Sequence, residues 1–401
     1  MKKLDHLFHY RTFDQRDRAI EQSKQPCILS VTQTVIDYGN GIYRDLEGID
    51  AINRLDKIKQ LGLANMCGYS SCSSGTRLVH SLICASEIDR LSQEKNLKDR
   101  ELGIVAGMSH DIATPPFSDS VSLGLGLNDE EQFEYVLNKY PDFDKVLDKY
   151  SVKKKDLVDV VTGKSNNIMS QLINNKRSLD IDRWSYTIYD AWNLDLLPKS
   201  KKPRKMRYVP SPFKNITIDD NKPVFTDIKS LSETLELRMQ MSTDVYSNPE
   251  LLAREAFLDR ISKDMIEKGI VTKESLFKMG DDDYMRLVCK HGGNIGNKLF
   301  QLFKFESYGT VNADERTVRD FLDSNVKTQF EVKRQKKFNT ASDSLVMVDG
   351  AIDTYKNLRP GHTLSMENRM SSLNKTFVYG LADDCKLLKE VKKAQKKFGI
   401  E

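Results

Sequence analysis

Apolar residues recur at every third or fourth position between Gly48 and Glu267, and this period limits the fold more than any other feature. Such a period is typical of amphipathic helices, whereas half-buried strands alternate at every second position. The pattern predicts a series of helices, at 48–62, 76–96, 98–111, 129–139, 142–150, 153–161, 166–176, 180–192, 228–243 and 248–267. A charged helical segment is also expected at 1–24. This part of the chain is therefore predicted to be mostly α.

Shorter periods, typical of β-strands, occur towards both ends of the chain. Residues 27–43 are rich in β-branched side chains and contain a Gly-Asn-Gly turn, so a hairpin is expected at about 27–46. A short strand is expected at 219–225, and short helices at 273–310. Later strands are expected at 326–334, 344–348 and 376–379, with a closing helix at 382–398. We therefore predict a helical core at 1–310, carrying the hairpin, and a mixed α/β lobe at 311–401.

The composition limits the size, partners and location of the protein. A chain of 401 residues with 39% hydrophobic content can bury a sizeable core, and a net charge of +4 excludes strong whole-molecule attraction to nucleic acid. The N-terminus lacks the apolar stretch of a signal peptide, and apolar runs such as 102–108 are too short to span a bilayer. We expect a cytoplasmic protein with no membrane partner. Its thiols are expected to be reduced, and Cys67 and Cys72 are interpreted as ordinary thiols rather than zinc ligands.

Four side chains suggest a metal site. The apolar run 102–107 predicts a buried helix that ends at His110 and Asp111, just before two prolines that disfavour further helix. His80 lies on the predicted helix 76–96, where it shares a stripe with Cys84. Asp182 begins the helix 180–192. Two imidazoles and two carboxylates suit manganese, iron, cobalt, nickel or zinc, and tolerate magnesium less well.

The helix that begins at Asp182 has two different faces. One face carries Asp182, Tyr186 and Asp190 with Arg183 beside them, and the opposite stripe is apolar. Arginine and tyrosine are suited to phosphate oxygens, and a carboxylate is suited to a hydroxyl group. The helix is therefore predicted to form one wall of a buried cleft.

These segments carry a resemblance to a known family. Residues 52–62, 75–82, 110–118 and 175–186 are similar, in order and in separation, to the HD-domain deoxynucleoside triphosphate triphosphohydrolases. The resemblance covers about 27–192, with a thinner trace to 287. It implies hydrolysis of a deoxynucleoside triphosphate to deoxynucleoside and triphosphate by a cytoplasmic, metal-dependent enzyme. It also implies a homo-oligomer, with a nucleotide acting as activator.

The resemblance assigns roles to individual residues. It implies that the metal ligands are His80, His110, Asp111 and Asp182. It implies phosphate contacts from Arg77, Arg183 and Tyr186, with Arg183 standing where relatives have a lysine. It implies recognition of the sugar 3′-hydroxyl by Gln60 and Asp190, although Gln60 alone is equally consistent with a surface helix residue.

One catalytic group of the family is missing. Relatives carry a further histidine after the His-Asp pair as general acid or base, and none of the six histidines can take that place here. Asp119, Glu130 or Glu131 could replace it if its pKa were raised by burial or by a neighbouring carboxylate. For the segment 129–131, an acidic first helical turn is an equally good interpretation.

The departure leaves other functions open. One is a different HD-domain nucleotide phosphohydrolase, such as a monophosphatase or a phosphodiesterase. Another is a catalytically impaired nucleotide- or nucleic-acid-binding protein. The basic stretch 199–207 would then bind nucleic acid, although a solvated loop is favoured there. The basic run 386–397 is interpreted as the solvated face of a helix.

Overall fold

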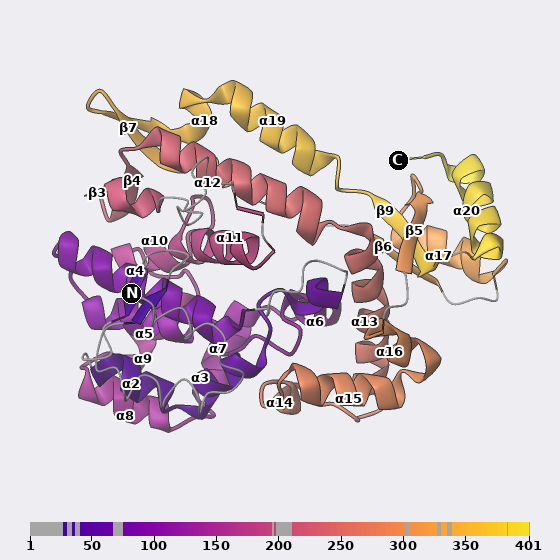
Figure 1. Ribbon diagram of the computed structural model, residues 1–401, viewed down its shortest axis with the longest axis horizontal. Helices are drawn as coiled ribbons and strands as arrows, with labels where there is room; N and C mark the ends of the chain where they lie inside the picture. The colour runs from indigo at the N-terminus through magenta and orange to yellow at the C-terminus, as the bar shows by residue number, and fades with distance from the viewer. Residues whose placement is uncertain are drawn as a thin grey trace, which may run out of the picture.

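The computed structural model describes residues 27–29, 34–36, 41–66, 75–194, 196–197, 211–301, 305–326, 330–334, 339–382 and 384–400. Helices make up most of the described chain, and three small sheets lie at its periphery (Figure 1). The prediction of a mostly α fold with a mixed α/β C-terminal part is confirmed. The predicted helix at 1–24, the basic stretch 199–207 and Cys67 and Cys72 lie outside the described residues.

The first half of the chain folds into a cluster of helices. In chain order these are α2 (Gly41–Glu47), α3 (Asp50–Arg54), α4 (Arg77–Glu94), α5 (Arg100–Ser109), α6 (Asp119–Leu125), α7 (Asp129–Leu137), α8 (Asp142–Lys149), α9 (Lys154–Val161), α10 (Ile168–Ile173) and α11 (Ile181–Asn193). Helix α5 is buried from Leu102 to Ser109, as its apolar sequence predicts. Gly107 allows α5 to lie close to α4, since a Cβ atom at this position would be only 2.6 Å from the Cα of Ala85.

A long helical arm crosses this cluster and then leads away from it. Helix α12 (Ile228–Gln240) lies over α11, continues through a π-helical turn, η5 (Met241–Tyr246), and is followed by α13 (Pro249–Glu267) (Figure 1). Asn248 caps α13, since its side chain accepts from the backbone N–H groups of Glu250 and Leu251. Three shorter helices follow: α14 (Lys273–Leu276), α15 (Asp281–His291) and α16 (Gly293–Leu299).

The sheets join distant parts of the chain. A hairpin is present as β1 (Cys27–Leu29) paired with β2 (Thr34–Ile36), but it is shorter than the one predicted at 27–46. Residues from Gly41 onward form helix α2 instead, because Ile42, Tyr43 and Leu46 are buried at helical spacing. A second sheet has the order β3 (Ile216–Asp219), β4 (Lys222–Phe225), β7 (Leu345–Val348) and β8 (Ala351–Thr354). A third has the order β5 (Phe305–Thr310), β9 (Thr376–Leu381) and β6 (Phe330–Arg334). Strands from both sides of the predicted boundary at residue 310 thus share sheets, and the boundary itself stays a prediction.

The remaining helices accompany these strands. Helices α18 (Tyr355–Leu358) and α19 (Pro360–Ser371) run alongside α12 (Figure 1). Helices α17 (Glu315–Asp323) and α20 (Cys385–Phe398) pack on the third sheet around a small apolar core of their own. That core includes Val318, Val378 and Val391.

Two further expectations about local structure were wrong. The helix predicted at 48–62 ends at Arg54, because Lys59 and Gln60 leave it to form backbone contacts with Thr76 and Gly75. The segment 305–310, expected to be helical, is the strand β5, because β9 supplies the backbone partners for it.

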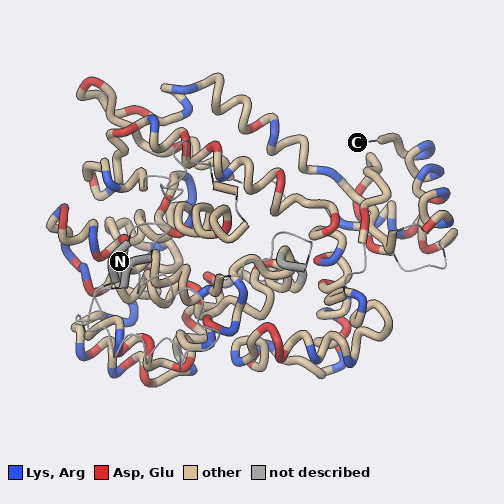
Figure 2. The backbone as a smooth tube through the Cα atoms, viewed as in Figure 1, with Lys and Arg blue, Asp and Glu red and all other residues tan. Residues whose placement is uncertain are grey.

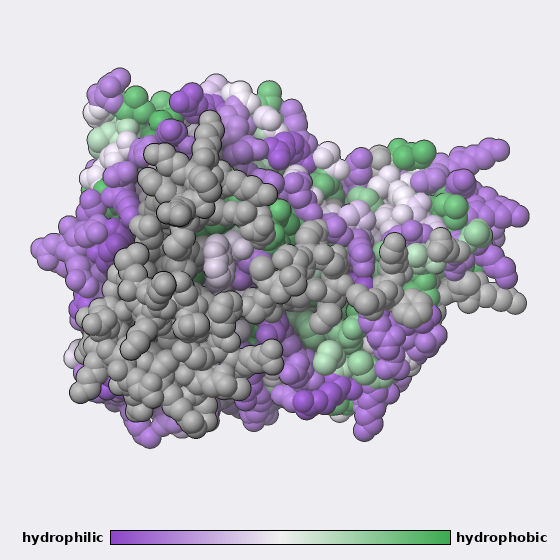
Figure 3. Space-filling view, viewed as in Figure 1, coloured by the Kyte–Doolittle hydropathy of each residue, from purple (hydrophilic) through white to green (hydrophobic). Residues whose placement is uncertain are grey.

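The described surface is mostly hydrophilic on the face shown in Figure 3, with small separate hydrophobic areas. Among the described residues, none of the helices combines the length and apolar character needed to cross a membrane.

Candidate metal centre

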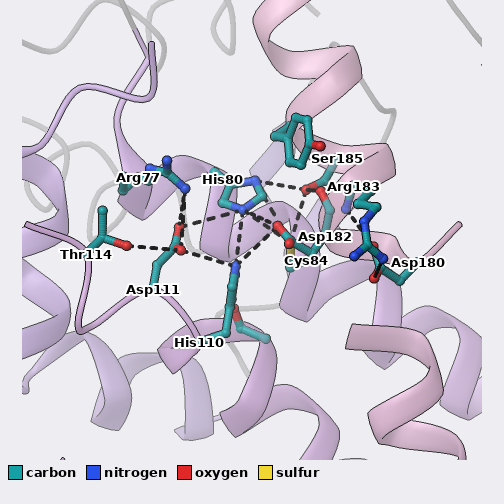
Figure 4. A network of polar contacts seen from close by, with 12 residues as sticks. Arg77, His80, Cys84, His110, Asp111, Thr114, Asp180, Asp182, Arg183 and Ser185 are labelled. Atoms are coloured by element: carbon teal, nitrogen blue, oxygen red, sulfur yellow. Dashed lines mark hydrogen bonds and ion pairs between the residues drawn. The ribbon is translucent and has the colours of Figure 1, made fainter. Parts of the chain in front are cut away.

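Side chains from three helices meet at one point in the helical cluster (Figure 4). His80 lies on α4, His110 and Asp111 follow the last residue of α5, and Asp182 lies in the first turn of α11. The Nε2 atom of His80 is 3.2 Å from Nε2 of His110 and 3.0 Å from Oδ1 of Asp182. His110 Nε2 is 3.5 Å from the same Asp182 oxygen. Asp111 places one carboxylate oxygen 3.7 Å from each histidine Nε2.

The separations among His80, His110 and Asp182 fit a single ion, and those to Asp111 are somewhat longer. Two atoms that each lie about 2.1 Å from one metal are about 3.0 Å apart at a right angle and about 3.4 Å apart at the tetrahedral angle. The hydrogen bonds of the two rings also fit. His110 Nδ1 is 2.9 Å from the carbonyl oxygen of Gly107, and His80 Nδ1 is 2.9 Å from the hydroxyl of Ser185. The Gly107 carbonyl can only accept, so His110 Nδ1 donates to it, and Ser185 can accept from His80 Nδ1 because its own hydroxyl donates to the Asp182 backbone carbonyl. With Nδ1 as the donor in each neutral ring, Nε2 carries the lone pair that a metal requires.

Cys84 is a further donor group at this point, and sequence reasoning placed it only on the stripe of His80. Ligand atoms of His80, Cys84, His110 and Asp182 lie within 4.8 Å of one another. The Cys84 sulfur is 3.0 Å from the Ser185 hydroxyl and 3.9 Å from His80 Nε2. Burial and the charge of Asp182 raise the pKa of the thiol well above its ordinary value, so the thiol is protonated when no metal is bound. The fourth ligand is therefore either this sulfur or Asp111.

The charges at the centre stabilise one another. Burial raises the pKa of Asp111, but Arg77 and the two histidines outweigh it, and the pKa falls below its usual value. Burial likewise opposes ionisation of Asp182, yet hydrogen bonds from His110 and His80 hold its pKa well below the usual range. Burial lowers the pKa of His110, and the charges of Asp111 and Asp182 raise it to a net value of about 9. In the absence of a metal, a proton thus occupies part of the ligand set.

Arg77 is held beside the centre by a turn of unusual conformation. Its Nη1 is 3.1 Å from Asp111 Oδ2, and its Nε donates to the Ser118 hydroxyl at 3.1 Å. Ser118 and the preceding Phe117 both have positive φ, of 53° and 57°, which costs non-glycine residues free energy. Asp281 of α15 stabilises this turn: its carboxylate accepts from the backbone N–H of Phe117 at 2.7 Å and from that of Lys59 at 2.8 Å.

The predicted phosphate-binding residues lie on α11 next to the centre. Arg183 forms an ion pair with Asp180 and also donates to the backbone carbonyl of Asn175. Tyr186 lies with its ring 6.5 Å from that of His80. Sequence reasoning missed Arg238 of α12, which donates to the Tyr186 hydroxyl and stacks over its ring. Its position on the buried stripe of α12 is the one sequence signal that could have found it.

The two predicted hydroxyl-recognising residues are both buried and incompletely satisfied. Asp190 Oδ2 accepts from the Tyr246 hydroxyl at 2.7 Å, and burial raises the pKa of the Asp190 carboxyl to about 7. Within the described part of the chain, neither Asp190 Oδ1 nor Gln60 Oε1 has a hydrogen-bond partner. Buried oxygens of this kind require a partner, and a ligand can supply one.

The three carboxylates considered as general acid or base occupy different surroundings. Asp119 is 3.9 Å from Arg77 and its side chain is 76% exposed. Glu130 is half-buried and lies close enough to Arg183 to raise the pKa of that guanidinium. Glu131 is exposed and accepts from the Asn128 side chain at 3.3 Å. Asp119 and Glu130 thus adjoin the cleft arginines, whereas Glu131 contacts the cap of its own helix.

Comparisons with known proteins find one similar protein by sequence and others by structure. No family model matches the sequence. A curated but uncharacterized protein of Methanocaldococcus jannaschii is 26% identical over 300 residues, which are 69% of this chain and 61% of that protein. The match thus spans less than two thirds of the relative.

Two solved structures superpose on nearly the whole chain. A hypothetical protein from Aquifex aeolicus has a TM-score of 0.70 at 19% identity, over 92% of this chain and 99% of its own. A phosphohydrolase from Bacteroides thetaiotaomicron has a TM-score of 0.67 at 16% identity, over 89% and 100%. At these identities the likeness establishes a shared fold.

Proposed function

We propose that the protein is a metal-dependent phosphohydrolase of the HD-domain class. The observation that carries this proposal is the convergence of His80, His110, Asp111 and Asp182 from three helices at separations suited to one ion. The same fold in a phosphohydrolase from Bacteroides thetaiotaomicron supports it. We assign the fourth ligand to Asp111 rather than Cys84, because the carboxylate is already ionised and lies the same distance from both histidines.

We further propose that the substrate is a deoxynucleoside triphosphate, which is cleaved to deoxynucleoside and triphosphate. A divalent ion at such a site supplies Lewis acidity, which polarises a phosphoryl oxygen and makes water a better nucleophile. The protein supplies the cations for the rest of the phosphate chain, namely Arg77, Arg183 and Arg238, with the hydroxyl of Tyr186. Three guanidinium groups around one centre favour a substrate with several phosphates over a monoester.

Recognition of the sugar is assigned to Asp190 and Gln60. Each offers a buried oxygen that lacks a partner among the described residues, and a sugar hydroxyl can donate to such an oxygen. The Tyr246 hydroxyl fixes the other Asp190 oxygen, so that the carboxylate is held in one orientation. A hydroxyl has one O–H to donate, so each ligand hydroxyl at this point would satisfy one of these two oxygens.

Proton transfer to the leaving group is assigned to Asp119 or Glu130. Both adjoin arginines of the cleft, and Glu131 does not. The structure offers no histidine in this role among the described residues, since the described histidines outside the centre are His291 on α15 and His362 on α19. We expect a carboxylate to do this work, with turnover slower than a histidine would give.

The test is a panel of nucleotides incubated with manganese, with triphosphate, pyrophosphate and phosphate resolved as products. The proposal expects triphosphate from deoxynucleoside triphosphates, and loss of all turnover in Asp182→Ala. Release of phosphate from monophosphates would instead indicate a monophosphatase. Turnover that survives Asp182→Ala would reject the metal mechanism, and unchanged turnover in both Asp119→Asn and Glu130→Gln would reject the assigned acids.

A further inference from the structure

The C-terminal helix α20 carries a concentrated positive charge. Six of its residues are exposed lysines: Lys386, Lys389, Lys392, Lys393, Lys396 and Lys397. Its one acidic residue is Glu390. We call these six side chains the lysine face. Figure 2 shows basic positions in blue along the backbone of α20, at the edge of the molecule opposite the helical cluster that holds the metal centre.

The lysine face lies opposite the buried stripe of the same helix. With successive residues about 100° apart, the six lysines fall within an arc of about 140°. The buried residues Leu387, Val391 and Ala394 occupy the other side, where they pack into the small apolar core of the C-terminal unit. The lysines are therefore held in one direction by a helix that cannot rotate.

Most of this charge is not neutralised within the protein. Across the residues that the structure describes, Lys393 is the one member of the face with an ion-pair partner, Glu390 at 2.7 Å. By contrast, lysines of α8 and α9 are paired: Lys145 with Asp142, Lys149 with Asp45, Lys154 with Asp144 and Lys155 with Asp159. Unpaired like charges on one helix face repel one another, so a polyanion that covers them is stabilised by all of them together.

The geometry favours a nucleic acid over a membrane as this polyanion. The lysine face extends for about 16 Å along the helix axis, which is the length of about five phosphate steps of one strand. A helix that binds a membrane inserts its apolar side, but here Leu387, Val391 and Ala394 are buried in the protein, and of the large aliphatic side chains of α20 only Leu388 is exposed. We propose that the lysine face of α20 binds the phosphate backbone of a nucleic acid, without base specificity.

The test uses the full chain and two variants that change the net charge equally. The first is Lys386→Gln, Lys389→Gln, Lys392→Gln and Lys396→Gln combined. The matched control is Lys145→Gln, Lys149→Gln, Lys154→Gln and Lys155→Gln combined. Fluorescence anisotropy with labelled 20-nucleotide oligothymidine and with a 20-base-pair duplex measures affinity over a range of salt concentrations. Circular dichroism melting checks that both variants fold. Both are expected to fold, because glutamine and lysine have similar helix propensities.

The wild-type protein is expected to bind at least one probe, with affinity that falls steeply as salt rises. The α20 variant is expected to bind about tenfold or more weakly at low salt, with a shallower salt dependence, because about four phosphate contacts are lost. The control is expected to bind within about twofold of wild type. Absence of binding to both probes, or equal weakening in both variants, would overturn the proposal. Retention by phosphatidylserine vesicles without binding to either probe would overturn it in favour of a membrane.

Discussion

Each histidine at the centre has one ring nitrogen committed to the protein and the other directed at the point where the carboxylates meet. The Gly107 carbonyl sets the orientation of His110, and the Ser185 hydroxyl that of His80. Second contacts of this kind fix the tautomer and the ring plane of metal ligands. At the scale of residues, the centre is therefore preorganised for an ion rather than assembled by it.

The fourth ligand can be identified by substitution. Asp111→Asn is expected to lower metal affinity by about 10-fold or more, because it removes the negative charge of a carboxylate with one oxygen near His80 and the other near His110. Cys84→Ser is expected to leave affinity within a few-fold of wild type. Isothermal titration with Mn²⁺ measures both. The reverse ranking, with Cys84→Ser the weaker binder, would assign the sulfur instead.

Metal binding is expected to release a proton near neutral pH. Because the pKa of His110 is raised from 6.5 to about 9, this ring is protonated at pH 7 when no metal is bound, and the ion must displace the proton. Metal affinity should rise with pH and level off above about 9. The same proton stabilises the metal-free fold fully below pH 6.5, and that contribution is lost as pH rises to about 9. Calorimetry in buffers of different ionisation enthalpy measures the released proton, and a value of zero at pH 7 would refute this account.

Arg238 is expected to bind substrate rather than metal. Arg238→Lys removes a planar donor beside Tyr186, so KM for a triphosphate substrate should rise about tenfold or more while the metal content stays unchanged. Arg369→Lys on α19, where the arginine pairs with Glu236, is the matched control and should leave KM unchanged. Equal effects of the two substitutions would place Arg238 outside the site.

At the scale of elements, two irregular segments position side chains near the centre. The turn at Phe117 and Ser118 holds Arg77 beside Asp111, and the π-helical turn η5 places the Tyr246 hydroxyl on Asp190. Irregularities of this kind are frequent at functional sites. The sequence predicted a single helix at 228–243, since a π-helical turn has no distinctive composition.

Asp281 is expected to stabilise the turn at Phe117 and Ser118, although it lies 164 residues after Phe117 in the sequence. Asp281→Asn leaves one of two buried backbone N–H groups unpaired, which should lower the free energy of unfolding by about 1–3 kcal/mol. It should also lower kcat/KM, because Ser118 would no longer hold Arg77. The control is Asp282→Asn, which changes the exposed neighbouring aspartate. Chemical denaturation measures the free energy of unfolding of both variants. Identical stability of the two variants would contradict the role given to Asp281.

The sequence predicted those elements whose own periodicity decides their structure. Helices such as α4, α5 and α11 lie where their patterns place them. The sequence prediction failed where a distant segment determines the local structure. Lys59 pairs with Thr76 instead of continuing a helix, and Phe305 belongs to a strand because β9 lies beside it. The same limit applies to the site. Four ligands were predicted from local motifs and a resemblance, but Arg238 reaches the cleft only through the packing of α12 on α11.

At the scale of the whole molecule, the two charged sites are separate. The metal centre lies within the helical cluster, and the lysine face lies on the C-terminal unit at the opposite edge (Figures 2 and 4). The fold of the whole chain is shared with proteins that are less than 20% identical to it. The proposals for the two sites can therefore fail or succeed independently.

The most direct test of the central claim is the metal content of the purified protein after incubation with Mn²⁺ and dialysis, measured by mass spectrometry of the metal. The account predicts about one ion per wild-type chain and less than about a tenth of that in Asp182→Ala, because the carboxylate shared by both histidines is gone. Equal metal content in the two proteins, or none in the wild type, would contradict it.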